Sequence, residues 1–183
     1  MTELLAKSPC DNMAPVERGT LRLEEVSLGN AYLVAPYAGA WSDVSAQLQK
    51  TIGAGLPSAG QTVVADAVRV LWFGRETALV VGVEKPPVIS GAAVTDQSDA
   101  WASIVLSGPL SPDVLARLVP VDMREKAMPV GATTRTMLGH MTASITRQDT
   151  DAFLILVFRS MAHTLVEEVT HAMECVVARH ARN

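Results

Sequence analysis

The chain has 183 residues and a formal net charge of −4, so it is long enough for one sizeable domain or two small units that share a core. The net negative charge and the lack of a basic cluster argue against nucleic-acid partners. No apolar run approaches the roughly 20 residues of a membrane helix. Hydrophobic residues make up 49% and charged residues 19% of the sequence, with a mean hydropathy of +0.24. Ordinary soluble domains carry about 25% charged residues, so the apolar surplus predicts a protein partner.

Residues 1–20 are predicted to form a flexible tail, because Pro9 and Pro15 occur there among polar residues without a hydrophobic period. The first residues include Glu3 and Lys7 in place of the continuous apolar core of a signal peptide. We therefore expect a cytoplasmic protein.

A first structural unit is predicted over residues 21–88, ending at a proline-rich break. Its elements, in chain order, are a strand at 21–26, a strand at 31–35, a helix at 42–52 and a hairpin at 68–83. The Gly29-Asn30 turn predicts that the first two strands pair with each other. Ser42 is a suitable N-cap for the helix, and Gly53 is a suitable terminator.

A second unit is predicted over residues 89–183. Its elements are a strand at 101–107, a helix of about two turns before Pro120, a strand at 133–137, a hairpin at 141–158 and a long final helix. Ser111 and Ser160 are the expected N-caps of the two helices. A hydrophobic stripe that runs from Met161 through Val169 to Val176 gives the final helix its buried face.

The two units share an internal spacing that indicates duplication. Asp43-Val44 and Leu48 in the first helix match Asp113-Val114 and Leu118 in the second. The predicted fold class is therefore α+β, with two βαββ units that place strands on one face and helices on the other, followed by a long C-terminal helix.

Metal and phosphate sites are the first chemical possibilities to weigh. Glu167, His171 and Cys175 recur every four residues on the final helix, but they lie opposite its apolar stripe and lack a fourth ligand. Cys10 and Cys175 give no disulfide or zinc spacing. Gly53-Ala54-Gly55 follows a helix instead of a strand, so a helix stop explains it better than a phosphate loop.

Catalytic candidates are equally isolated. His140 has no neighbouring nucleophile or orienting acid, and Ser160 lacks the Gly-x-Ser-x-Gly elbow, so a turn and a cap explain them. Arg159 could meet a carboxylate of a ligand or partner, although a local ion pair is the favoured role. The remaining candidates are short acids at element ends (Asp96, Asp99 and Asp122) and two rings expected in the core or an interface (Trp41 and Trp101). We assign no catalytic, cofactor-binding or metal-binding residue.

The second half carries an ordered series of motifs: DQSDAW (96–101), LSGP (106–109), LVPVD (118–122), TMLGHM (136–141) and FRSMA (158–162). In order and spacing this series resembles the gamma subunit of heterotetrameric sarcosine oxidase. The first half matches only in length and general pattern.

This resemblance implies a small subunit of an αβγδ complex that oxidatively demethylates sarcosine to glycine and hydrogen peroxide and delivers the one-carbon unit to tetrahydrofolate. It also implies alpha, beta and delta subunits as partners. FAD, FMN, NAD, zinc and the folate site would belong to those subunits or their interfaces, and the gamma chain would contribute no catalytic residue.

The resemblance leaves two alternatives open. The fold is also similar to the first part of folate-binding aminomethyltransferases, so a free-standing aminomethyltransferase is one alternative. Those enzymes have a catalytic aspartate after a glycine-containing segment that leads into a strand. The comparable residues 138–147 of this chain contain no Asp or Glu. The other alternative is a gamma-type subunit of a complex that oxidises another N-methyl amino acid, such as N-methylglutamate.

Overall fold

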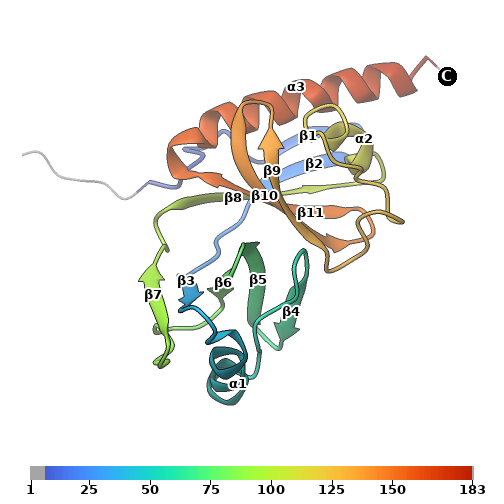
Figure 1. The fold of residues 1–183 in the computed structure, drawn as a ribbon. Helices are drawn as coiled ribbons and strands as arrows, with labels where there is room; N and C mark the ends of the chain where they lie inside the picture. The colour runs from blue at the N-terminus through green and yellow to red at the C-terminus, as the bar shows by residue number, and fades with distance from the viewer. Residues whose placement is uncertain (1–6, 183) are drawn as a thin grey trace, which may run out of the picture.

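The computed structural model describes residues 7–182 and contains two antiparallel sheets between layers of helix (Figure 1). The six-stranded sheet has the order β1 (Val16–Arg18), β2 (Leu21–Glu25), β8 (Trp101–Ser107), β11 (Ala152–Phe158), β10 (Met141–Asp149) and β9 (Thr133–Leu138). The five-stranded sheet has the order β4 (Thr62–Ala65), β5 (Val68–Gly74), β6 (Thr77–Val81), β3 (Ala31–Pro36) and β7 (Ala92–Asp96). The helices are α1 (Trp41–Ile52), α2 (Ser111–Leu115), the 3-10 turn η1 (Arg159–Met161) and α3 (Ala162–His180).

Three apolar clusters hold these layers together. One joins the six-stranded sheet to α2 and α3 and includes Leu23, Ile155 and Leu165. A second lies between the two sheets, and a third joins the five-stranded sheet to α1 through Val44 and Leu48. The layers therefore run from α3 through the two sheets to α1, as Figure 1 shows from top to bottom.

The two units repeat one topology, which confirms the predicted fold class. In each unit a strand leads into a helix and then into three further strands. The resulting orders, β4-β5-β6-β3 and β9-β10-β11-β8, correspond strand for strand. A short edge strand, β4 or β9, precedes the hairpin of each predicted βαββ unit.

The predicted pairing of the first two long strands is wrong. β2 pairs with β8 of the second unit, whereas β3 pairs with β6 and β7. Leu21 and Leu23 are fully buried in the cluster beneath α3, so their burial holds β2 in the other sheet. The segment around Gly29-Asn30 is a crossover between sheets, where the Asn30 amide donates to the Glu84 carbonyl. The division at residue 88 stays a prediction.

Residues 7–20 differ from the predicted flexible tail, and the first six residues of that prediction lie outside the described range. Cys10 is completely buried, and β1 forms antiparallel pairs with β2. The Arg18 guanidinium lies 2.9 Å from the Glu174 carboxylate on α3. The sequence does not reveal the packing of this segment, because its buried residues are isolated and do not recur at a regular spacing.

The predicted serine caps are also wrong. α1, α2 and α3 have Ala40, Leu110 and Met161 at their N-cap positions, and none of these makes a side-chain capping bond. The Ser111 hydroxyl instead donates to the Gly108 carbonyl at 2.7 Å, which ties α2 to the end of β8. α2 also ends at Leu115, before the second turn that was predicted.

Other local predictions are confirmed. Gly53 ends α1 with φ +76°, as its lack of Cβ allows. The strands at 141–149 and 152–158 form the predicted hairpin, and α3 buries the predicted stripe through Leu165, Val169 and Val176.

A buried arginine fixes the long segment between α2 and β9. Arg147 is 1% exposed; its guanidinium donates to the carbonyls of Met123 and Thr150 and lies 4.5 Å from the Phe153 ring centre. Among the described residues no carboxylate pairs with Arg147, so backbone carbonyls and a ring take the place of an acid.

Candidate interaction surface

The acidic candidates serve the turns in which they lie. The Asp96 carboxylate accepts hydrogen bonds from the Ser98 amide at 2.9 Å and the Ser98 hydroxyl at 2.6 Å, and these bonds lower the pKa of Asp96. Asp122 accepts bonds from the side chain and backbone of Arg124, which lower its pKa to about 2. Asp99 borders a surface cavity described below. The turn contacts agree with the structural role that was favoured for Asp96 and Asp122.

The histidine candidates lie on separate surfaces. Glu167 and His171 are exposed on α3, and the His171 Nε2 lies 3.8 Å from the half-buried Cys175 Sγ. His140 is exposed in the turn between β9 and β10. Within the range that the structure describes, no three His, Cys, Asp or Glu residues are grouped so as to hold a metal ion.

Arg159 connects the start of η1 to the N-terminal segment. Its amide donates to the Ala100 carbonyl at 2.9 Å, and its guanidinium donates to the Lys7 carbonyl at 2.6 Å. The favoured local ion pair is therefore replaced by a bond to backbone. Arg159 also borders, with Asp99 and Trp101, an open cavity of about 610 Å³.

Three rings and one cation form a compact cluster at one end of the space between the sheets. Trp101 stacks on Phe158 at 5.0 Å between ring centres and meets Phe73 edge-on at 4.9 Å. The Arg135 guanidinium lies 4.3 Å from the Phe73 ring centre and 5.6 Å from that of Trp101. These four residues are called the Arg135 cluster below. Since the chain has only three Phe and three Trp residues, the cluster concentrates scarce aromatic area at one place.

The exposed part of this region forms a row across the six-stranded sheet. Met137 on β9 pairs with Thr142 on β10. On the next two strands of the sheet, Phe158 on β11 pairs with Trp101 on β8. Met137 is 43% and Phe158 48% exposed, whereas Trp101 is only 7% exposed. Arg135 points to the same face as Met137, because side chains two apart on a strand share a face. An apolar rim therefore lies beside a half-buried cation.

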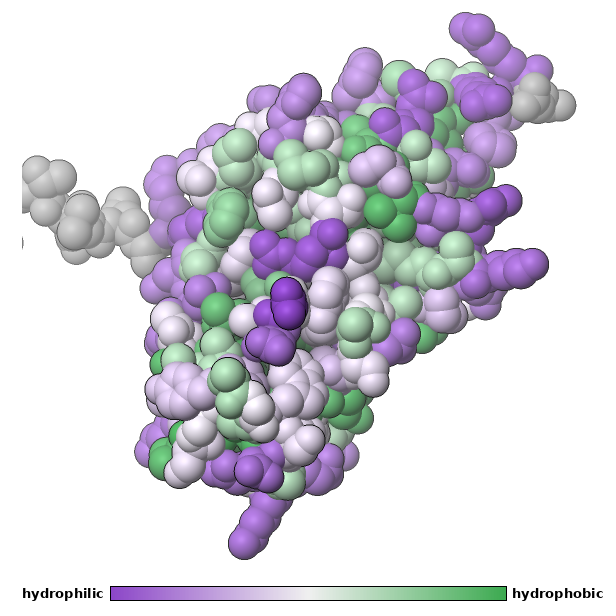
Figure 2. Space-filling model, viewed as in Figure 1, coloured by the Kyte–Doolittle hydropathy of each residue, from purple (hydrophilic) through white to green (hydrophobic). Residues whose placement is uncertain are grey.

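The β9 strand beside this row is a partly open sheet edge. At one end, the Thr133 amide donates outward to the Gly60 carbonyl, and at the other the Gly139 amide donates to the Leu118 carbonyl. Because backbone groups alternate in direction along a strand, the outward groups between these ends belong to residues 135 and 137. On the face seen in Figure 2, hydrophilic side chains gather at the level between the two sheets, with hydrophobic ones above and below.

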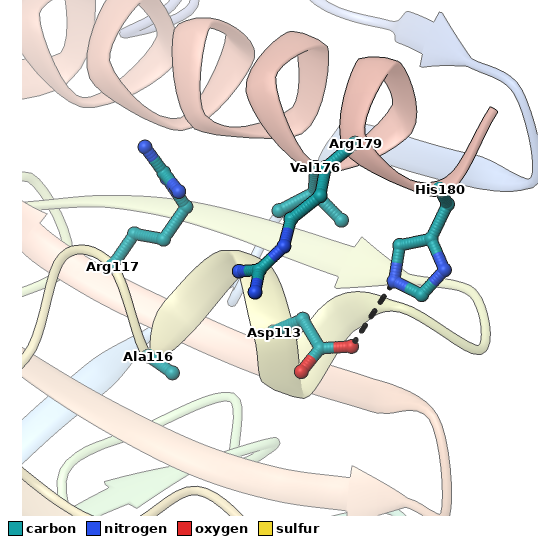
Figure 3. A pocket seen from close by; sticks show the side chains of 6 residues that line it. All are labelled: Asp113, Ala116, Arg117, Val176, Arg179 and His180. Atoms are coloured by element: carbon teal, nitrogen blue, oxygen red, sulfur yellow. Dashed lines mark ion pairs between the residues drawn. The ribbon is translucent and has the colours of Figure 1, made fainter. Parts of the chain in front are cut away.

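A second hollow lies between α2 and the last turns of α3 (Figure 3). It has a volume of about 440 Å³, and Val176 lies on its α3 side. Arg179 reaches from α3 toward α2, Arg117 lies across from it, and the His180 Nε2 is 3.8 Å from the Asp113 carboxylate (Figure 3). The basic groups at the end of α3 also complement the negative end of the helix dipole, which gives them a structural role.

The sequence interpretation missed Arg135 and the exposed position of Phe158. An alternation signal was present, since Arg135 and Met137 occupy every second position of a predicted strand. It could not show which face was buried, because the partner rings come from β5, β8 and β11.

No protein-family model matches the chain. Comparisons of its sequence and of its fold with individual proteins both find a sarcosine oxidase. Sarcosine oxidase subunit gamma from Corynebacterium sp. (strain P-1) is 26% identical, over 91% of this chain and 89% of that protein. A chain of the heterotetrameric sarcosine oxidase from Corynebacterium sp. U-96, solved in complex with pyrrole 2-carboxylate, has a TM-score of 0.82 at 22% identity. That match covers 95% of this chain and 97% of the other. The resemblance that the sequence motifs indicated is confirmed.

The fold is also similar to aminomethyltransferase T of the glycine cleavage system from Bartonella henselae, with a TM-score of 0.57 at 14% identity. This match covers 83% of our chain but 46% of the aminomethyltransferase. It therefore shows a shared fold for part of that enzyme.

Across residues 7–182, no helix has the length and apolar character to span a membrane.

Proposed function

We propose that this chain is the gamma-type subunit of a heterotetrameric sarcosine oxidase, an oxidoreductase complex. The observation that carries the proposal is the nearly complete coverage of both chains in the comparison with sarcosine oxidase subunit gamma, 91% and 89%. Sequence and fold agree, because the structural match to the heterotetrameric enzyme covers both chains to at least 95%.

Within such a complex, the proposed role is structural support of the catalytic subunits. The candidate residues of this chain bond to their own turns or lie apart on its surface, as Asp96, Asp122 and His140 do. The proposed reaction of the complex is demethylation of sarcosine to glycine with release of hydrogen peroxide and transfer of the one-carbon unit to tetrahydrofolate. FAD, FMN, NAD, zinc and tetrahydrofolate are proposed to bind to the alpha, beta and delta subunits. The cytoplasmic location expected from the sequence stays a prediction.

Co-expression with candidate alpha, beta and delta subunits tests this proposal. We expect a tagged form of this chain to co-purify all three in fixed stoichiometry, and the purified complex to form peroxide when sarcosine is added. Omitting this chain should lower the yield of assembled complex. A stable monomer that ignores the three candidates would refute the proposal.

The same purified complex separates the substrate alternatives. Peroxide or reduced acceptor formed with N-methylglutamate but not with sarcosine would identify the other substrate class. The subunit role would then stand, while the proposed substrate would be wrong.

The fold likeness to aminomethyltransferase T is the one observation that favours a free-standing transferase. Residues 138–147 lack the acid that such a reaction is expected to use, and the likeness covers less than half of that enzyme. Tetrahydrofolate binding and aminomethyl transfer by the isolated chain would establish this alternative.

A further inference from the structure

The hollow between α2 and α3 collects positive charge in a chain whose net charge is −4. It is called the α2–α3 hollow below, and its lining consists of Asp113, Ala116, Arg117, Val176, Arg179 and His180. Within residues 7–182, no ion pair involves Arg117 or Arg179. The one acid of the lining, Asp113, lies 3.8 Å from His180 instead. Two guanidinium groups therefore line this hollow without an acid of their own.

The walls of the α2–α3 hollow are held in place by the core beneath them. Val176 of α3 is 4% exposed and belongs to the same apolar cluster as Val114 of α2. The Arg117 amide donates to the Val114 carbonyl at 3.2 Å, which fixes the backbone that carries this arginine. Figure 3 shows the Arg179 side chain reaching across toward α2, with Arg117 on the opposite side. Both cations are thus attached to backbone that the fold keeps in position.

The fold alone does not explain why two cations from different helices meet here. The dipole of α3 favours basic groups in its last turn, where Arg179 lies, but α2 has only five residues and its dipole gives Arg117 little. Like charges that line one hollow repel each other, although water and salt screen the repulsion while the hollow is open. An acid placed between the two guanidinium groups would replace this repulsion by attraction.

We infer that the α2–α3 hollow is a docking site for an acidic segment of another subunit, which places an aspartate or glutamate carboxylate between Arg117 and Arg179. This inference rests on the proposed function, because it takes its partner from the same complex. It adds the surface and the chemistry of the segment that binds there. The carboxylate accepts charge-assisted hydrogen bonds from both guanidinium groups, and Ala116 and Val176 offer apolar contact to the methylene groups of the acid.

Charge complementarity favours a protein segment over the other occupants. Arg117 and Arg179 are exposed in the isolated chain, so a free anion would stay in water and gain little from them. A subunit that covers the hollow removes this water and strengthens each contact between its carboxylate and a guanidinium group. A second copy of this chain joined at the hollow would bring the arginines of both copies together, with only Asp113 of each copy to oppose their repulsion.

Neutral variants of the lining test the inference in opposite directions. The double variant Arg117→Gln/Arg179→Gln removes both charges, and we expect it to bind the remaining subunits at least about tenfold more weakly than the unmodified chain. Asp113→Asn removes the acid that competes with the partner's carboxylate, so it should bind about two- to fivefold more tightly. A purely structural role of the hollow predicts no gain for Asp113→Asn, because this variant loses the contact with His180.

Arg69→Gln/Arg75→Gln is the matched control, since it removes two positive charges from exposed positions on β5 and in the turn that follows it. Its affinity should stay within about twofold of the unmodified chain. Added salt should weaken binding of the unmodified chain more steeply than binding of the double variant, because contacts between charges at the edge of an interface are screened. Thermal unfolding of each isolated variant shows whether it is folded.

Full affinity of Arg117→Gln/Arg179→Gln, or no gain for Asp113→Asn, overturns the inference, while assembly of the unmodified chain still supports the proposed function. Inorganic phosphate added to the isolated chain tests for a free anion. Saturable shifts of the Arg117 and Arg179 NMR signals would identify an oxyanion as the occupant and overturn the inference. A homodimer of the isolated chain that the double variant dissociates would identify a second copy, with the same consequence. Failure of the unmodified chain to bind any candidate subunit overturns both the inference and the proposed function.

Discussion

Replacement of Gly108 by alanine tests the joining of the N-terminal strand to the second sheet. Gly108 follows β8 and has φ +118°, and a Cβ there would lie 2.2 Å from the Thr20 carbonyl oxygen. That distance is about 1.2 Å short of the 3.4 Å at which ordinary contact begins. Because Thr20 directly precedes β2, the added methyl group must push β2 away from β8.

The expected loss of stability has two parts. The positive φ costs an alanine about 1–2 kcal/mol. Displacement of β2 weakens one or two backbone hydrogen bonds to β8, at about 1 kcal/mol each, and loosens the packing of Leu21 by about 1 kcal/mol. Together these predict a destabilisation of about 3–5 kcal/mol for Gly108→Ala.

Gly131→Ala is the matched control, since Gly131 has φ +86° and no atom of the described residues lies within 4 Å of its added Cβ. It should lose only the conformational part, about 1–2 kcal/mol. Urea unfolding of both variants measures the difference, provided the slopes of the transitions agree. If Gly108→Ala is no less stable than Gly131→Ala, then β2 does not lie against β8 as described.

Two further predictions concern buried side chains. Arg147→Ala should lower the free energy of unfolding by about 3–5 kcal/mol, because two loop carbonyls lose a charged donor and a cavity remains, and a loss under about 1 kcal/mol in urea unfolding would contradict this account. The Cys10 thiol has its pKa raised from 9.0 to about 12, first by desolvation and then by Glu25, so folding favours the protonated thiol. Stability from this group is complete below pH 9 and decreases as the pH rises toward 12, where only the unfolded thiol ionises. The unmodified protein should therefore lose more stability than Cys10→Ala between pH 8 and pH 10, and equal losses would show that Cys10 is not buried as described.

Local sequence signals predicted those parts of the fold whose contacts are local. The hairpin at 141–158 carries an apolar alternation and a turn, and the α3 stripe carries a helical period, each within one continuous segment. The repeat was visible because the apolar spacing of Val44 and Leu48 recurs at Val114 and Leu118. Each of these signals depends on neighbours a few residues apart, so tertiary structure had little opportunity to override it.

Contacts between distant segments could not be predicted in the same way. The strand at Leu21–Glu25 has the alternation of a half-buried strand, but alternation does not say which sheet will receive it. The nearby Gly29-Asn30 signal favoured the local hairpin, whereas the buried area of Leu21 and Leu23 decided the outcome. The Arg135 cluster is a stronger case, because its four members come from four strands that span residues 73–158.

The structure also changes the reason for expecting a partner. The high hydropathy of the sequence suggested an excess of apolar surface, but a two-sheet sandwich with helices on both sides needs three buried layers, and three apolar clusters fill them. Within residues 7–182, the large apolar residues that stay exposed are few, and most of them are scattered. Scattered exposed residues are ordinary in a monomer and need no partner. The expectation of a partner therefore depends on the similarity to sarcosine oxidase subunit gamma, and not on composition.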